Sequence, residues 1–451
     1  MNNLYIAIDL GAESIRVSIG LHDRIIETIS HTNIPVNDDH YGLIWNINKI
    51  YCDVISSLNL LINKYFNPHN VIHSISITSW GLDYISFDNE DVVYPCFHYR
   101  NKRYLNGIYK IKNNYDLYKL TGSQRLEFNT LVQLLSADAI KSNKSIERHT
   151  FSFVADAISC MITRHTTLVC DLSIASTSQL LDINTLEWNQ LYDNYCLPQI
   201  IKPGYVFGSH ANIPIISTLS HDTACAVHYT TQLASASNID TDSYVYVILG
   251  TWCIVGTINN KPVTSKDAYY KNVSNEVGYQ MNYKNTDIDK CDKYYRILKN
   301  CSGLWLLQQY YQHLNMTNNI SYEEFYKLSY SRIGCPYKFI NLTDQLYMTT
   351  SAELSYIFDN ISDPGKFIHD VTSSLTHLIL KCINDIEFVM KKKYLNLIVV
   401  GGGCNNKTIL STLKLTRNII VGSTQSTTLG NLHMQHALNV NTSRDTIGNI
   451  A

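Results

Sequence analysis

Two segments of the sequence share one pattern, a strand, a glycine-containing turn and a second strand, and this repeat constrains the fold most. Residues 4–20 contain the turn Gly11-Ala12-Glu13-Ser14 between two apolar, alternating runs. Residues 244–258 have the same layout around Gly250-Thr251. Self-similarity of this kind indicates two related halves. We therefore expect an α/β protein with two domains, residues 1–240 and 241–451, joined through the polar segment 238–243.

The composition excludes several classes of protein. With 45% hydrophobic and 16% charged residues in a chain of 451, the sequence is typical of a globular protein. A formal net charge of -2 without a basic run argues against a nucleic-acid or polybasic membrane surface. The sequence has no apolar run of about 20 residues, so we expect no membrane span. The first ten residues resemble a strand and not a signal segment. The 12 cysteines lack CxxC pairing and fit reduced thiols, so we expect a cytoplasmic protein.

The periodicity of apolar residues predicts further elements. We expect strands at 71–79, 84–88 and 395–400 and helices at 129–141, 151–163 and 367–391. A helix start is expected at 221–229, and one helical segment is expected to carry both Asn300 and Gln308.

Three glycine-containing turns are candidates for phosphate or nucleotide binding. Small residues in the turn 11–14 let backbone N–H groups approach a phosphate, and Arg16 adds a cation, although an ordinary hairpin would have the same sequence. Asp9 precedes this turn and could hold Mg²⁺ through water. The turn at Gly250-Thr251 is similar. Gly401-Gly402-Gly403 follows an apolar strand and could let a ring or ribose lie on bare backbone, or form a simple flexible turn.

Asp222, in Ser220-His221-Asp222-Thr223, is the candidate general base. A carboxylate there could accept the proton of a sugar hydroxyl as the hydroxyl attacks phosphorus. The alternative is a helix N-cap, and both roles are compatible. His221 alone is more often a packed histidine than a catalyst. Asp83 and Arg100 could bind sugar hydroxyls or form an ion pair, and Asn300 and Gln308 could be ordinary exposed or capping amides.

Taken together, these segments resemble the FGGY carbohydrate kinases, and within that family the rhamnulokinases. The motifs occur in family order and span nearly the whole chain. They are Asp9-Leu10-Gly11-Ala12-Glu13-Ser14-Ile15-Arg16, Trp80-Gly81-Leu82-Asp83-Tyr84, Asn129-Thr130-Leu131-Val132-Gln133-Leu134, Ser220-His221-Asp222-Thr223-Ala224, Gly250-Thr251-Trp252, Asn275-Glu276, residues 300–308, Gly401-Gly402-Gly403-Cys404-Asn405-Asn406 and Leu429-Gly430-Asn431.

The resemblance implies a fold, a reaction and a set of site residues. The fold would be two actin-like, RNase-H-like domains with an active-site cleft between them, and the reaction would be ATP- and Mg²⁺-dependent phosphorylation of L-rhamnulose at its 1-hydroxyl in rhamnose catabolism. Asp222 would be the base. The sugar would be bound by Gly81, His221, Asp222, Thr223 and Asn300. The ATP site would be lined by Ala12, Glu13, Ser14, Ile15, Arg16, Thr251, Gln308 and Gly402.

Some positions depart from the family pattern. Ile15 and Val277 stand where glycine is usual, and Asn101 stands where aspartate is usual. The segment 423–427, which contains Gln425, also differs. These departures leave two alternatives open, a kinase for another ketose such as L-fuculose or ribulose, and a non-catalytic protein that still binds sugar or nucleotide. The expected partners are small molecules alone, and the sequence does not indicate an oligomeric state.

Overall fold

The computed structural model describes residues 2–89, 91–104, 111, 114–140, 150–189, 196–280, 292–318, 320–344, 347 and 351–448. These residues pack into two compact units. Unit 1 comprises Met1–Tyr229, Asn259–Arg296 and Thr427–Ala451, and unit 2 comprises Thr230–Ile258 and Ile297–Ser426. The sequence-based domain division at residues 240 and 241, and the expected cleft, stay predictions.

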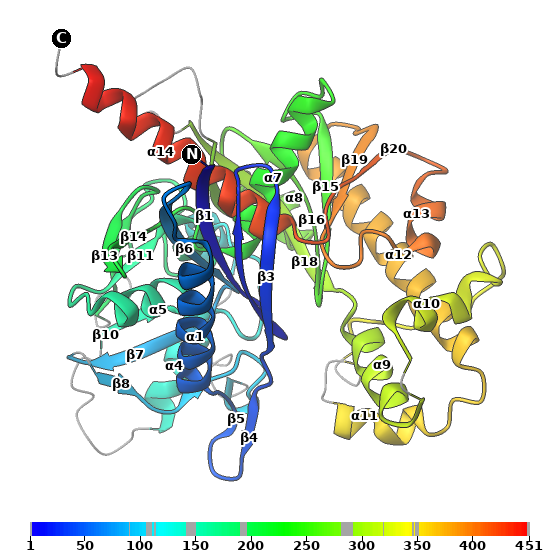
Figure 1. Cartoon of the computed structure of the whole chain (residues 1–451). Helices are drawn as coiled ribbons and strands as arrows, with labels where there is room; N and C mark the ends of the chain where they lie inside the picture. The colour runs from blue at the N-terminus through cyan, green and yellow to red at the C-terminus, as the bar shows by residue number, and fades with distance from the viewer. Residues whose placement is uncertain are drawn as a thin grey trace. The chain divides into compact units, whose positions relative to one another are not determined.

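The elements of the chain up to residue 236 come first (Figure 1). The strands are β1 Asn2–Leu10, β2 Ser14–Gly20, β3 Ile25–Thr32, β4 Val36–Asp38, β5 Gly42–Trp45, β6 Asn70–Ser79, β7 Tyr84–Asp88, β8 Asp91–Val93, β9 Cys96–Phe97, β10 Thr150–Phe153, β11 Val169–Asp171, β12 Gln199–Ile201, β13 Val206–His210 and β14 Ile213–Ile216. The helices are α1 Ile47–Tyr65, the 3₁₀ helix η1 Lys102–Tyr104, α3 Tyr115–Thr121, α4 Thr130–Ile140, α5 Val154–Thr163, α6 Leu172–Ala175 and α7 Asp222–Ala236.

The remaining elements follow residue 236. The strands are β15 Tyr244–Leu249, β16 Trp252–Asn259, β17 Ser274–Gln280, β18 Asp292–Ser302, β19 Asn396–Val400 and β20 Asn418–Val421. The helices are α8 Lys266–Tyr270, α9 Trp305–Asn318, α10 Tyr322–Tyr330, α11 Ser351–Phe358, α12 Pro364–Met390, α13 Lys407–Leu413 and α14 Ser426–Gly448. None of the helices in these described ranges is long and apolar enough to cross a membrane.

Two six-stranded sheets repeat the same central arrangement. The first has the order β13-β14-β6-β1-β2-β3, with β1 antiparallel to β2 and parallel to β6. The second has the order β17-β18-β16-β15-β19-β20, with β15 antiparallel to β16 and parallel to β19. In both sheets, therefore, a hairpin with a glycine-containing turn has a parallel strand beside its first strand. This confirms the repeat that the sequence predicted, and the α/β fold class.

The faces of these sheets are covered by helices whose sequences favour that position. α1 begins at the N-cap Asn46, whose side chain accepts a bond from the backbone N–H of Lys49, and it buries one apolar side that includes Val54 and Leu58. α1 packs against β2, and α5 packs against β6 and β13. α12 has its N-cap at Asp363 and Pro364 in its first turn, as a helix start favours.

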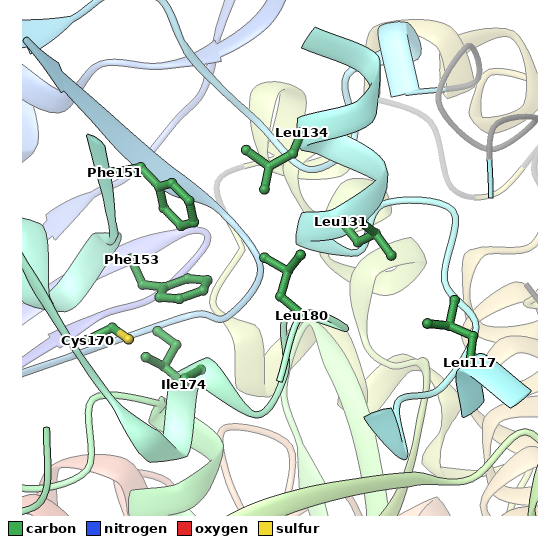
Figure 2. Packing of buried hydrophobic residues seen from close by; sticks show 9 residues of the cluster. Leu117, Leu131, Leu134, Phe151, Phe153, Cys170, Ile174 and Leu180 are labelled. Carbon is green, nitrogen blue, oxygen red and sulfur yellow. The ribbon is translucent and has the colours of Figure 1, made fainter. Parts of the chain in front are cut away.

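An apolar cluster supports the smaller elements of unit 1. Nine buried residues of α3, α4, β10, β11 and α6 and their flanks form it: Leu117, Leu131, Leu134, Phe151, Phe153, Cys170, Ile174, Ala175 and Leu180 (Figure 2). One sequence-based prediction is corrected here. Residues 150–153 form the strand β10 and not the start of a helix, because Phe151 and Ser152 pair with β7.

Candidate active site

Asp222 is the first residue of α7, and the chain leading into it lies against the end of β6. The backbone N–H of Ser79 donates to the carbonyl of Ser220 at 2.9 Å. Oδ1 of Asp222 accepts hydrogen bonds from the backbone N–H of Thr223 and, at 3.1 Å, from its hydroxyl. The side chain of Asp222 keeps 28% of its surface exposed. The carboxylate is therefore held at a helix N-terminus and remains accessible.

The surroundings of Asp222 suit a base that works near neutral pH. Burial, and then the negative charge of Asp9, raise its pKa to about 7, while the bonds from Thr223 and the charge of Arg296 oppose the rise. A general base is most effective when its pKa lies near the working pH. The arrangement can therefore take up a proton from a hydroxyl group and release it again to solvent.

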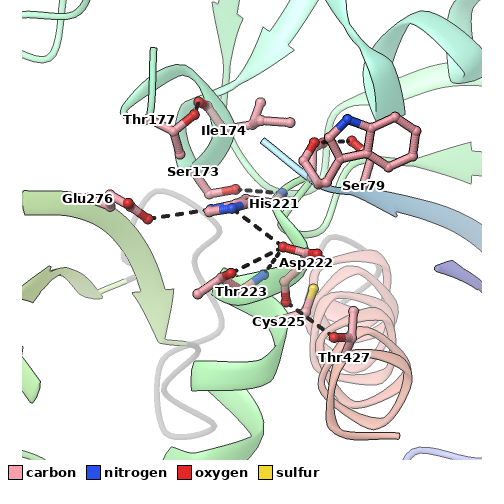
Figure 3. A network of polar contacts seen from close by, with 12 residues as sticks. Ser79, Ser173, Ile174, Thr177, His221, Asp222, Thr223, Cys225, Glu276 and Thr427 are labelled. Atoms are coloured by element: carbon pink, nitrogen blue, oxygen red, sulfur yellow. Dashed lines mark hydrogen bonds and ion pairs between the residues drawn. The ribbon is translucent and has the colours of Figure 1, made fainter. Parts of the chain in front are cut away.

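His221 lies between two carboxylates (Figure 3). Its Nε2 is 3.4 Å from Oδ1 of Asp222, and its Nδ1 is 3.5 Å from Oε2 of Glu276. Its backbone N–H donates to the hydroxyl of Ser173 at 3.2 Å. Burial, and then the charge of Arg296, hold the pKa of His221 well below its usual value. The imidazole is therefore neutral across the physiological range.

Gly81 lies against the same imidazole. A Cβ atom at this position would lie 3.2 Å from Nε2 of His221 and 3.1 Å from the hydroxyl oxygen of Thr177. The lack of a side chain thus leaves Nε2 uncovered on that side. The structure therefore brings together four of the predicted sugar-binding residues in unit 1: Gly81, His221, Asp222 and Thr223.

Sequence reasoning missed the buried ion pair behind His221. Arg296 of β18 is 0% exposed and Glu276 of β17 is 3% exposed, and their side chains meet at 3.2 Å. Asp156 and Asp171 are also buried, close to the turn at 220–222, and neither was predicted to have a role. A carboxylate inside the apolar run 151–163 is a signal that could have pointed to Asp156, because an isolated buried carboxylate is costly.

The N-terminal turn is a closed hairpin with Asp9 at its base. The backbone N–H of Gly11 donates to the carbonyl of Ser14, and the side chain of Asn33 donates to the carbonyl of Gly11 at 2.8 Å. Nη1 of Arg16 is 3.4 Å from Oδ2 of Asp9. Ala12, Glu13 and Ser14 are half-buried residues of the turn, whereas the side chain of Ile15 is fully buried in the sheet.

The donor set here fits Mg²⁺ that is held mainly by phosphates and water. Among the described residues, no three side chains of His, Cys, Asp or Glu form a group that could hold a metal ion by themselves. Mg²⁺ in kinase sites commonly needs only one or two carboxylates besides the substrate phosphates. Asp9, at the base of the N-terminal turn, is the carboxylate that would hold such an ion through water.

Four predicted site residues belong to unit 2, namely Thr251, Asn300, Gln308 and Gly402. Thr251 lies in the turn between β15 and β16, which is fixed because the backbone N–H of Leu304 donates to the carbonyl of Gly250 at 2.9 Å. Gly402 is exposed, and a Cβ there would meet no heavy atom within 4 Å. Within the part of the chain that is described, the buried Oε1 of Gln308 accepts no hydrogen bond.

Asn300 and Gln308 do not share a helix, so that prediction was wrong. Asn300 lies in β18, which continues to Ser302, and α9 begins only at Trp305. Gly303 separates the two elements and packs tightly, since a Cβ there would lie 2.5 Å from the carbonyl oxygen of Gly250. The close approach to the Gly250 turn interrupts what periodicity alone presents as one helical segment.

Asp83 and Asn101 are both committed to structural hydrogen bonds. Asp83 is fully buried and accepts bonds from the indoles of Trp45 and Trp80, at 2.6 and 3.0 Å. Gln133 and the backbone N–H of Tyr99 also donate to its carboxylate, at 2.8 and 3.2 Å. These bonds favour a structural role for Asp83 over sugar binding.

The side-chain NH₂ of Asn101 donates to the backbone carbonyls of Tyr41 and Leu43, both at 2.8 Å. An aspartate could not make either bond, because an ionised carboxylate only accepts. The departure from the family pattern at this position therefore has a structural reason in this chain.

Comparison with known proteins defines the class. A ligand-bound xylulose kinase from Lactobacillus acidophilus superposes with a TM-score of 0.71 at 15% identity, over 97% of this chain and 90% of that chain. Plasmodium falciparum glycerol kinase with ADP gives a TM-score of 0.69 at 15% identity, over 100% and 92%. The fold is thus the two-domain, actin-like α/β fold of these kinases, as the resemblance implied.

The sequence comparisons identify the family. Residues 4–202 match the N-terminal domain of the FGGY family of carbohydrate kinases. A rhamnulokinase from Mannheimia succiniciproducens is 25% identical over 456 residues, which cover 95% of this chain and 88% of the relative. Residues 4–202 thus carry the N-terminal domain of this family, and the likeness to the rhamnulokinase continues over nearly the whole chain. The prediction of an ATP-using sugar kinase is confirmed at this level, and the choice of sugar stays a prediction.

Proposed function

We propose that this protein transfers the γ-phosphoryl group of ATP to the 1-hydroxyl of L-rhamnulose, with Asp222 as the general base. The observation that carries the proposal is the position of Asp222, an accessible carboxylate with a pKa of about 7 that lies beside His221 and Thr223. The rhamnulokinase relative, similar over 95% of this chain, supports the choice of L-rhamnulose.

The chemical step needs little more than a base and a well-placed phosphate. The sugar oxygen forms a bond to the γ-phosphorus, the bond between that phosphorus and the bridging oxygen breaks, and ADP leaves. Asp222 takes the hydroxyl proton as the new bond forms. Positioning and electrostatic stabilisation supply most of the remaining rate enhancement in phosphoryl transfer.

The proposed sugar contacts follow from the chemistry of each side chain. Nε2 of His221 and the hydroxyl of Thr223 can bond to sugar oxygens, and Gly81 leaves the space for the ring or chain. Asn300, whose amide can both donate and accept, is proposed as a further sugar ligand. Asp222 would accept the bond from the reacting hydroxyl.

The proposed nucleotide contacts lie in both units. In unit 1, the turn residues Ala12, Glu13 and Ser14, together with Ile15 through its backbone and Arg16 through its charge, would hold phosphates. In unit 2, Thr251, Gln308 and Gly402 would line the ATP site. Mg²⁺, held by the phosphates and through water by Asp9, would neutralise charge on the phosphates.

A panel of sugars tests this proposal. L-rhamnulose, L-fuculose and ribulose are each incubated with saturating ATP and Mg²⁺, and ADP release is followed in a coupled assay. The proposal expects the highest kcat/KM with L-rhamnulose. A higher value with another ketose would make the protein a sister kinase. Calorimetric binding of sugar and ATP without ADP release would instead establish a non-catalytic binding protein.

A further inference from the structure

Arg296 is a fully buried arginine with four polar neighbours. Nη1 is 3.1 Å from Nδ1 of His221. Nη2 donates to the carbonyls of Ser173 and Val277, both at 3.1 Å, and lies 3.2 Å from Oε2 of Glu276. Burying an arginine is costly unless its charge is paired and its N–H groups are bonded. The contact with His221 therefore belongs to a fixed arrangement of the interior.

This contact determines which nitrogen of His221 carries the proton. A guanidinium has N–H donors and no acceptor, so Nδ1 of His221 must accept the bond from Arg296. In the neutral imidazole the proton then lies on Nε2. Glu276 does not reverse this assignment, because its Oε2 lies 3.5 Å from Nδ1, farther than Nη1 of Arg296 at 3.1 Å, and its charge is balanced by the ion pair with Arg296 at 3.2 Å.

The protonated Nε2 is the atom that faces the candidate active site. It lies 3.4 Å from Oδ1 of Asp222 and beside the uncovered backbone of Gly81. His221 thus presents an N–H donor where a sugar oxygen would lie, and only an acceptor oxygen can use it. The opposite tautomer would offer an acceptor there and leave the Arg296 N–H without its bond.

We propose that Arg296, with Glu276 as its counter-charge, is a positioning residue that fixes His221 as the Nε2–H tautomer, so that His221 donates to a carbonyl or hydroxyl oxygen of the sugar. The catalytic meaning of this inference rests on the proposed kinase function. The assignment of the tautomer does not depend on that function, because it follows from contacts within unit 1.

The direct test is a nuclear magnetic resonance measurement of the imidazole nitrogens. Full-length protein labelled with ¹⁵N-histidine is recorded in long-range ¹H–¹⁵N spectra between pH 6 and 8, and His221 is assigned from the signals lost in His221→Asn. The proposal expects one protonated nitrogen, Nε2, and no titration. A proton on Nδ1, or on both nitrogens at pH 7, would overturn it.

A double variant separates positioning from simple support of the fold. Removing one partner of a buried ion pair is strongly destabilising, whereas replacing both by apolar residues is often neutral. We therefore expect Arg296→Met/Glu276→Leu to stay folded, to show both tautomers of His221, and to lose up to about tenfold in kcat/KM for the sugar, as expected when one neutral hydrogen bond to the sugar is weakened. The KM for ATP should be unchanged. A folded double variant that keeps a single Nε2–H tautomer would refute the role of Arg296.

A matched control removes an arginine elsewhere. Arg332 pairs with Asp363 at 2.6 Å in unit 2, so Arg332→Met should leave the His221 signals and the sugar kinetics as they are. A change in the His221 signals in this variant would contradict the specific role given to Arg296. If the wild type phosphorylates no sugar, the proposed function is wrong. The tautomer measurement still tests whether Arg296 fixes His221 as the Nε2–H tautomer.

Discussion

The hydroxyl of Ser220 donates to Oδ1 of Asp156 at 2.6 Å, two residues before the candidate base. Oδ1 of Asp171 accepts a second bond, at 3.3 Å, from the backbone N–H of Ser220. The backbone N–H of Ser173 donates to the same oxygen of Asp171 at 2.8 Å. The hydroxyl of Ser173 in turn accepts a hydrogen bond from the backbone N–H of His221. Two buried carboxyl groups therefore set the backbone course that leads into Asp222.

Asp156 should make the protein less stable as the pH rises. Burial, and then the charge of Asp171, raise its pKa to about 8, above the unfolded value of 3.8. Between these values the folded state binds one proton more than the unfolded state, so the free energy of unfolding falls by about 1.4 kcal/mol per pH unit. Asp156→Asn removes this proton, and urea unfolding at pH 5 and pH 7 should show a shallower pH dependence than in the wild type.

The exposed Asp88 provides the control for this experiment. Asp88→Asn should keep the wild-type dependence of unfolding on pH. Equal pH dependence in Asp156→Asn and the wild type would show that Asp156 is ionised in the folded protein.

Asp9→Asn should move the acidic limb of activity to lower pH. The charge of Asp9 contributes to the raised pKa of Asp222, so its removal favours the ionised base at lower pH. The profile of kcat/KM for the sugar should rise through about pH 7 in the wild type, where Asp222 loses its proton, and through a lower pH in the variant. An unchanged limb in Asp9→Asn would argue that another group titrates.

Gly401 and Gly402 are adjacent in the turn after β19, but replacing each with alanine should affect the stability of the protein differently. Gly401 has a φ of 92° and a Cβ there would lie 2.7 Å from the carbonyl oxygen of Leu249, so Gly401→Ala should cost about 2 kcal/mol or more. Gly402 has open space, so Gly402→Ala should leave the melting temperature near that of the wild type.

Gly402→Ala also tests the nucleotide proposal, because the added methyl group would lie where ATP is proposed to contact bare backbone. The KM for ATP should rise in this folded variant while the KM for the sugar stays the same. An unaltered KM for ATP would remove Gly402 from the proposed site.

Gly81→Ala should weaken sugar binding. Its Cβ would crowd Nε2 of His221 and the hydroxyl of Thr177, at 3.2 and 3.1 Å, and cover the donor proposed for the sugar. The crowding itself should lower the free energy of unfolding by about 1–3 kcal/mol. The blocked hydrogen bond from Nε2 should raise the sugar KM roughly tenfold, with little change in the KM for ATP. Steady-state kinetics with each substrate varied in turn measure the two KM values. Parallel rises in both KM values would indicate a general distortion of the site and not a specific loss of sugar binding.

The features of the fold that depend on a local sequence pattern could be predicted from the sequence. The hairpins around Gly11 and Gly250 were predictable because apolar alternation and a glycine-containing turn occur within some 20 residues. The helix α12 was predictable from its long apolar side, although its observed start at Pro364 precedes the expected one.

The features that sequence missed depend on contacts between distant segments. Arg296 and Glu276 lie on different strands, and nothing in either strand shows that both side chains meet at His221. The break between Asn300 and Gln308 comes from the close packing of Gly303 on the Gly250 turn, which periodicity does not register.

Asp222→Asn tests whether Asp222 acts as the base. The variant keeps the size of the side chain, so calorimetry should show sugar binding close to that of the wild type. Turnover in the ADP-release assay with L-rhamnulose should fall roughly a hundred-fold or more, the usual span of general-base catalysis. Turnover close to the wild-type rate in this variant would show that Asp222 is not the base.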